Sequence, residues 1–201
     1  MSVRQLAVLM NHQLVIERTR RWIATVVIDL NLCPFARRVF DNDLIRYVVT
    51  EAADSGSLFQ VLSYELVALA AVPSSEVETT LLIHPFALGE FLAYNDFLGD
   101  ADRLIGQLGL TGIIQIASFH PAYRFADAEP DAVENYTNRS PYPMLHLLRE
   151  ESVTRVSAEM EDLAEIPRRN VVTLQALGLE RMLERLKAIH GMDALENTSH
   201  E

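Results

Sequence analysis

The spacing of apolar positions predicts an amphipathic helix over residues 13–32. Ile23 and Val27 belong to one helical stripe, while arginines and a glutamate occupy the opposite side. The segment from Asn31 to Pro34 ends this helix, because the residue before a proline avoids helical backbone angles. The chain is therefore expected to begin with a helix that buries one face.

Three short apolar segments follow, and each is predicted to be a strand. Strands over residues 44–50, 79–83 and 113–119 alternate with helices over residues 55–72 and 88–108. Right-handed crossovers would make these three strands parallel. The pattern predicts an α/β fold around a β-α-β-α-β core. Its small, mostly parallel sheet has three strands, or four, and additional helices lie at both ends of the chain.

The chain after the third strand predicts a long loop and then helices. Residues 120–143 hold four prolines and four aromatic residues. Unstructured segments of this length are uncommon unless they are functional or disordered, and the aromatic residues argue against disorder. Residues 144–163 and 167–189 are predicted to be helical, with a polar tail over residues 190–201.

Composition limits the classes of protein to consider. A chain of 201 residues with 49% hydrophobic content predicts a single domain, with its core over about residues 12–189. The 28 acidic residues outnumber the 17 basic ones, which argues against a nucleic-acid partner. No apolar run approaches the ~18 residues that a membrane span needs, and no targeting segment is evident. We expect a cytoplasmic protein without a membrane or nucleic-acid partner.

Charge is unevenly distributed along the chain. Residues 1–50 hold seven arginines and four acidic residues, whereas residues 51–100 hold eight acidic residues and no arginine or lysine. The two segments could form contacts with each other or with another protein, or the acidic one could be a solvated surface. Contacts with another protein would suit a non-catalytic interaction or scaffold protein, in which the histidines are structural.

Two histidine–proline dipeptides follow the second and third predicted strands. His84 and His120 would both lie at the carboxyl edge of a parallel sheet, where ligands of open α/β sheets bind. Histidine titrates near neutral pH and is the commonest metal ligand, so the pair could be general acid–base groups or metal ligands. Alternatively, each imidazole caps a strand end with a hydrogen bond.

His146 is the third candidate for this site. On the predicted helix His146 and Glu150 are four residues apart and share a face, so Glu150 could orient the imidazole. His146 would then complete a catalytic set, or a divalent metal site with His84 and His120. No metal-binding signature is present, and a surface ion pair on the helix is the simpler alternative.

Polar residues near the long loop could bind an anionic group. Arg139 and Asn138 offer a guanidinium and an amide, and Tyr123 and Arg149 lie near them in the sequence. Arg139 could equally pair with acidic residues to hold the loop together. The predicted ligand is a small anionic molecule.

Cys33 is the only cysteine, so no internal disulfide can form. At the end of a helix the thiol would be inert, because the helix dipole raises its pKa. If Pro34 instead begins a new turn with Arg37 and Arg38, the thiolate is favoured and Cys33 could react or contact a ligand.

Five blocks of the sequence resemble one bacterial family, catalogued as domain of unknown function 1415. They are NLCPFA at residue 31, TTLLIHP at 79, FLAYNDFL at 91, IIQIASFHPAYRF at 113 and NYTNRSPYPMLHLLREESV at 135. The resemblance covers about residues 12–185 and implies that these blocks form one unit. The family implies no activity, substrate or cofactor.

The sequence therefore predicts a small enzyme or ligand-binding domain. Its site would use histidines and arginines at the carboxyl edge of the sheet, covered by the long loop, and it would act on a small anionic molecule. The alternative is the non-catalytic interaction protein.

Overall fold

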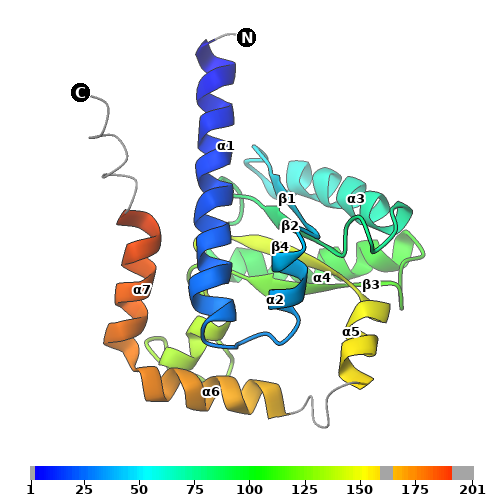
Figure 1. Cartoon of the computed structure of the whole chain (residues 1–201). Helices are drawn as coiled ribbons and strands as arrows, with labels where there is room; N and C mark the ends of the chain where they lie inside the picture. The colour runs from blue at the N-terminus through cyan, green and yellow to red at the C-terminus, as the bar shows by residue number, and fades with distance from the viewer. Residues whose placement is uncertain (1–2, 159–164, 192–201) are drawn as a thin grey trace.

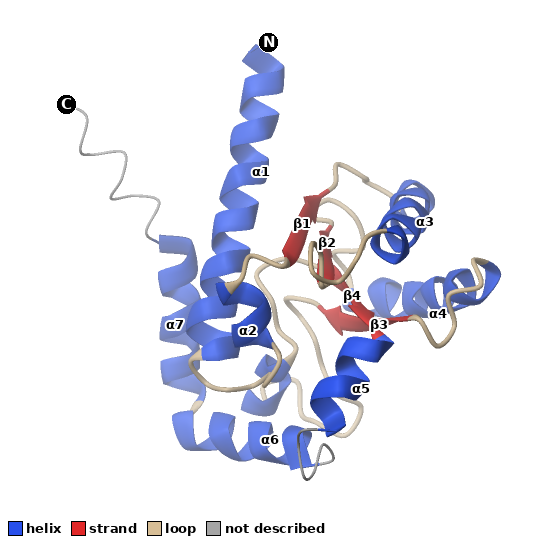
Figure 2. Cartoon of the chain, turned by 45° about the vertical axis from the view of Figure 1, so that its right-hand side comes forward, coloured by secondary structure: helices blue, strands red, loops and turns tan. Residues whose placement is uncertain are grey.

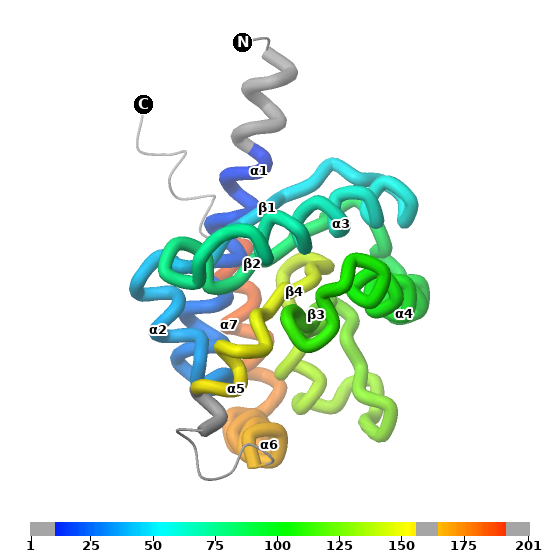
Figure 3. The backbone as a smooth tube through the Cα atoms, turned by 90° about the vertical axis from the view of Figure 1, so that its right-hand side faces the viewer, coloured from blue at the N-terminus to red at the C-terminus, as the bar shows by residue number. Residues whose placement is uncertain are grey.

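Four strands form one mixed sheet in the computed structural model, which describes residues 3–158 and 165–191 (Figure 1). In chain order the strands are β1 (Ile45–Val49), β2 (Thr79–Ile83), β3 (Ile114–Phe119) and β4 (Met144–Arg149). Their order across the sheet is β1-β2-β4-β3 (Figure 3). Strands β1 and β2 pair in parallel, and β4 is antiparallel to both β2 and β3. The three predicted strands therefore point the same way, with β4 inserted between two of them.

Helices cover both faces of the sheet (Figure 2). One face carries α3 (Ser55–Ala71) and α4 (Phe91–Gln107). The other face carries a second group of helices. They are α1 (Val3–Trp22), the π-helix η1 (Ile23–Ile28), α2 (Ala36–Asp41), α5 (Glu150–Ala158), α6 (Glu165–Leu177) and α7 (Leu179–Gly191). A hydrophobic core lies on each side of the sheet. The α/β prediction is confirmed, but the prediction of a mostly parallel sheet is wrong, because β4 pairs antiparallel to both of its neighbours.

The prediction of a helix over residues 144–163 is wrong at its start. Residues 144–149 form β4, and α5 begins only at Glu150. Four of the six residues in MLHLLR are apolar. The periodicity of so short a segment cannot distinguish a strand from a helix. Strand geometry prevails because alternate residues enter the two cores, with Leu145 and Leu147 on one side and Met144 on the other. Residues 159–164 lie outside the described residues.

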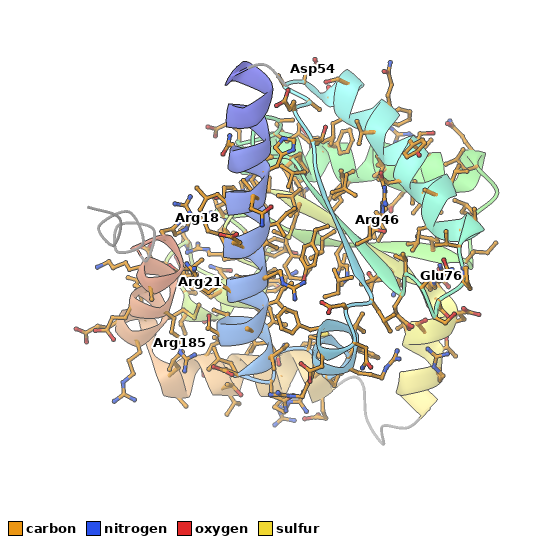
Figure 4. The ribbon with its side chains drawn as sticks, turned by 45° about the horizontal axis from the view of Figure 1, so that its top comes forward. Arg18, Arg21, Arg46, Asp54, Glu76 and Arg185 are labelled. Carbon is orange, nitrogen blue, oxygen red and sulfur yellow. The ribbon has the colours of Figure 1, made fainter. Side chains whose placement is uncertain are left out.

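The predicted helix over residues 167–189 is two helices instead of one. Gly178 has a φ of 79°, a left-handed conformation that suits glycine and ends α6. The chain then turns, and α7 packs along α1. Arg21 and Arg185 lie at this helix pair (Figure 4) and donate to the carbonyls of Ile189 and Thr25 at 2.9 and 2.5 Å. Most of the predicted polar tail, residues 192–201, lies outside the described residues.

Ion pairs join the basic and acidic segments of the chain. Arg38 Nη2 lies 3.0 Å from Glu78 Oε1, and Arg46 Nε lies 2.9 Å from Glu65 Oε2. Arg46 reaches across to α3 (Figure 4). Opposite charges of the two segments therefore meet inside the fold. None of the helices in the described part of the chain is both long and apolar enough to cross a bilayer.

Candidate functional site

His84 and His120 lie at the carboxyl edge of the sheet and hold the loop between β2 and α4. His84 Nδ1 lies 3.0 Å from the carbonyl oxygen of Ala87, and His120 Nε2 lies 3.1 Å from that of Leu88. A carbonyl only accepts, so these two ring nitrogens carry the protons. His120 Nδ1 accepts a hydrogen bond from the N–H of Ala122 at 3.0 Å. Both neutral rings thus support backbone, as in the strand-capping alternative.

Tyr94 of α4 fills the space between these two histidines. Its ring centroid lies 5.9 Å from that of His84 and 5.1 Å from that of His120. Its hydroxyl donates to the carbonyl of Met144 and accepts from the N–H of Phe119, which ties the ends of β4 and β3 together. Burial lowers the pKa of His84 to about 4 and also lowers the pKa of His120. This edge is a packed aromatic cluster.

The polar residues of the long loop make contacts within the loop and to β3. This segment contains one turn of 3-10 helix, η2 (Val133–Thr137). Arg139 donates to the carbonyls of Tyr123 and Pro130 at 3.0 and 2.7 Å, and its guanidinium lies 4.5 Å from the ring centroid of Tyr136. Asn138 donates to the carbonyl of Ser118 at 3.0 Å. Arg139 therefore stabilises the loop through carbonyl groups, rather than through the acidic residues that the sequence suggested.

A cavity of about 280 Å³ lies on the opposite face of the sheet, between the strands and the helices η1, α2 and α5. Most of its walls are apolar, with large side chains from Trp22, Ile23, Val27, Phe35, Val39, Ile45, Leu81, Phe119 and Leu148. Its polar lining consists of Cys33, Arg38, Glu78, Thr79, Gln115, His146, Arg149 and Ser152. A π-helix is rare and often marks a functional site, and η1 supplies one wall of this cavity.

His146 occupies the centre of the cavity floor. In the register of the sheet it lies beside Leu81 on β2 and Ala117 on β3. The small side chain of Ala117 leaves room next to the imidazole, and the Phe119 ring centroid lies 6.1 Å away. Burial lowers the pKa of His146 to about 4, so the ring is neutral near pH 7. Within the described residues, nothing hydrogen-bonds to either ring nitrogen.

Charged residues gather at one end of the cavity. The buried carboxylate of Glu78 pairs with Arg38 at 3.0 Å and with Arg155 at 3.1 Å. Arg149 is also buried, and its Nη2 donates to the carbonyls of Leu69 and Val72 at 2.7 and 2.6 Å. Arg149 therefore caps the C-terminal end of α3, although part of its side chain lines the cavity.

Cys33 lies at the cavity wall, in the turn between η1 and α2. Burial raises the pKa of its thiol and outweighs the backbone N–H groups of Phe35 and Ala36, which favour the thiolate. Pro34 does begin a new turn, but the environment is that of the inert, neutral thiol.

The structure divides the predicted site residues into two groups. His84, His120 and Tyr123 meet at the carboxyl edge, whereas Cys33, His146 and Arg149 line the cavity on the other face. The predicted pairing of His146 with Glu150 on one helix is wrong, because His146 lies on β4 and Glu150 begins α5.

The three histidines do not form a metal site. His84 and His120 are absent from the lining of the cavity that holds His146. Among residues 3–158 and 165–191, no three His, Cys, Asp or Glu side chains lie close enough together to hold a metal ion. The metal hypothesis therefore has no support in the described residues.

A family model described as protein of unknown function (DUF1415) matches residues 14–184. The chain belongs to this family. No curated protein and no solved structure matches it. The matched range contains every cavity-lining residue of this DUF1415 protein, from Trp22 to Val153.

Several cavity residues were not predicted from the sequence. Trp22, Arg38, Glu78 and Gln115 come from four separate elements or turns, and only the folded sheet brings them together. One signal was present, since Gln115 lies between two isoleucines of β3, as His146 lies between two leucines of β4. Polar residues within buried strands are uncommon unless something pairs with them.

Proposed function

We propose that this DUF1415 protein binds a small organic molecule in the cavity beside His146. The observation that carries the proposal is a neutral imidazole in a mostly apolar cavity, with neither ring nitrogen hydrogen-bonded to another described residue. Neither ring nitrogen is among the fully buried unpaired atoms of the described residues, so a small molecule in the cavity can reach them. Water has little place between apolar walls, which favours a polar group of the bound molecule as the hydrogen-bond partner. A bound molecule would supply the missing partner.

The dimensions of the cavity indicate the size of the molecule. An apolar protein cavity of ~150 Å³ is large enough to bind benzene. The cavity of about 280 Å³ has room for one ring with a short substituent. Ligand sites of this type are mostly apolar, with a few polar groups that fix orientation. His146 and the charged end of the cavity would have that role.

The chemistry of His146 also allows proton transfer. A neutral imidazole can accept a proton at one nitrogen and donate one at the other. Because burial opposes the charged ring, protonation would be transient unless the bound molecule became anionic at the same time. A molecule that reacts further after losing a proton to His146 would be the substrate of an enzyme, and one that binds without reacting would be a ligand.

The single tryptophan provides a direct assay of binding. Trp22 lines the cavity, is 2% exposed, and packs edge-to-face on Phe119 with ring centroids 5.4 Å apart. We expect 2-phenylethanol to produce a saturable change in Trp22 fluorescence. Substitution Ala117→Leu should abolish that change, because the larger side chain fills the space beside His146.

The matched control is Ala70→Leu, which makes the same change at an exposed position of α3, on the other side of the sheet. This variant should titrate like the unmodified protein. Circular dichroism would verify that both variants are folded. A wild-type protein without a saturable response, or an Ala117→Leu variant that titrates normally, would contradict binding in this cavity.

A further inference from the structure

The cavity is polar at one end and aromatic at the other. Along β3, Phe119 and then Ala117 and Gln115 face the cavity in turn, and their partners on β4 are Met144, His146 and Leu148. Trp22 packs against Phe119 at the aromatic end. The other end of the floor is next to Glu78, Arg38 and Arg149. His146 lies between the two ends.

The polar end carries more positive charge than negative. Glu78, whose side chain is 6% exposed, is shared by Arg38 and Arg155, so one guanidinium charge remains uncompensated within this group of three. The positive charge of Arg149 faces the carbonyls at the end of α3, which partly neutralise it.

Arg38 is the member of this group that can meet a ligand. It lines the cavity, yet its side chain is 50% exposed. Its Nη2 contacts Glu78, and a guanidinium has five N–H donors, so donors remain for another acceptor. The planar guanidinium matches a carboxylate, which can accept two parallel hydrogen bonds.

We infer that the molecule bound beside His146 is a small aromatic monocarboxylic acid, with its ring against Trp22 and Phe119 and its carboxylate at Arg38. This inference rests on the proposed function. Edge-to-face contacts between aromatic rings favour an aromatic ring of the ligand at the aromatic end of the cavity. One uncompensated guanidinium suits a single negative charge, and the buried carboxylate of Glu78 would repel a phosphate, which carries nearly two.

Two probes with the same carbon skeleton test the inference by calorimetric titration near neutral pH. Phenylacetate carries the carboxylate, and 2-phenylethanol carries a hydroxyl in its place. We expect phenylacetate to bind at least about tenfold more tightly, because a charge-assisted hydrogen bond is stronger than the neutral one that a hydroxyl makes.

A charge-matched pair of variants assigns that preference to Arg38. Substitution Arg38→Gln should remove the tenfold preference, because it weakens the binding of phenylacetate far more than that of 2-phenylethanol, whose hydroxyl accepts only a weaker hydrogen bond. Substitution Arg37→Gln removes the same charge at an exposed neighbour that does not line the cavity, and it should preserve the preference.

The outcomes separate this inference from the proposed function. If 2-phenylethanol binds and phenylacetate binds no more tightly, the inference of a carboxylic acid ligand is wrong, while the cavity remains a binding site. If Arg38→Gln weakens both probes equally, Arg38 shapes the cavity and does not hold a carboxylate, which also overturns the inference. If 2-phenylethanol does not bind the wild-type protein, the proposed function itself fails.

Discussion

Substitution Arg149→Met is expected to lower the free energy of unfolding by about 2–4 kcal/mol. Arg149 is 7% exposed, and its guanidinium donates to the carbonyls of Leu69, Val72 and Val77. Methionine has a similar length but no donor, so three carbonyls lose a partner where water has little access. The positive charge at the end of α3 is lost as well. Urea unfolding followed by circular dichroism measures the change.

The control for this substitution is Arg103→Met on α4. The side chain of Arg103 is 70% exposed and, within the described part of the chain, pairs only with Asp100 in the same helix. Its loss should therefore change stability by less than about 0.5 kcal/mol. If Arg149→Met proves as mild as Arg103→Met, then the guanidinium does not clamp α3 to the sheet.

Acidification is expected to destabilise the protein through its buried histidines. Burial lowers the pKa of both His84 and His146 from 6.5 to about 4. The unfolded chain therefore binds protons near pH 6.5, whereas the folded chain resists them until about pH 4. Protonation between these values favours the unfolded state, so stability is full above about pH 6.5 and decreases toward pH 4. Each histidine contributes about 3 kcal/mol to this loss.

A single variant separates the contribution of His146 from the other effects of acid on stability. Between pH 6 and pH 5 the wild-type protein should lose about 2 kcal/mol of unfolding free energy, and His146→Gln should lose about half of that amount. Glutamine does not titrate, so the difference in slope reports the pKa of His146 alone. Equal slopes for the two proteins would show that His146 is not held neutral by burial. Urea titrations at each pH provide the free energies.

The local pattern of apolar and polar residues was sufficient to predict much of the fold. The leucines of residues 55–72 and the apolar run at residues 79–83 match α3 and β2 closely, because each segment has a period, a length and flanking turn residues that agree. Residues 144–149 were mistaken for helix because six residues, four of them apolar, have no informative period. Strand pairing on both sides decides its conformation, and that pairing depends on partners more than 20 residues away in the sequence.

The prediction of the candidate site was limited by the same error at β4. The sequence indicated that His84 and His120 follow two strands, and both do lie at the carboxyl edge. Their partners, the carbonyls of Ala87 and Leu88, come from loop geometry that no residue pattern specifies. His146 was recognised as a candidate, but its environment was not. Only the register of β4 reveals that it shares a face with Ala117, and that this small neighbour leaves a cavity.

The most direct test of the account is a histidine-detected nuclear magnetic resonance titration of the whole chain. The chain has six histidines, and ¹⁵N-labelled imidazoles report hydrogen bonding at each ring nitrogen. Titration with 2-phenylethanol near pH 7 should shift the resonances of His146 and leave those of His84 and His120 unchanged. Shifts at His84 and His120 with His146 unaffected would contradict the cavity as the binding site and favour the carboxyl edge of the sheet.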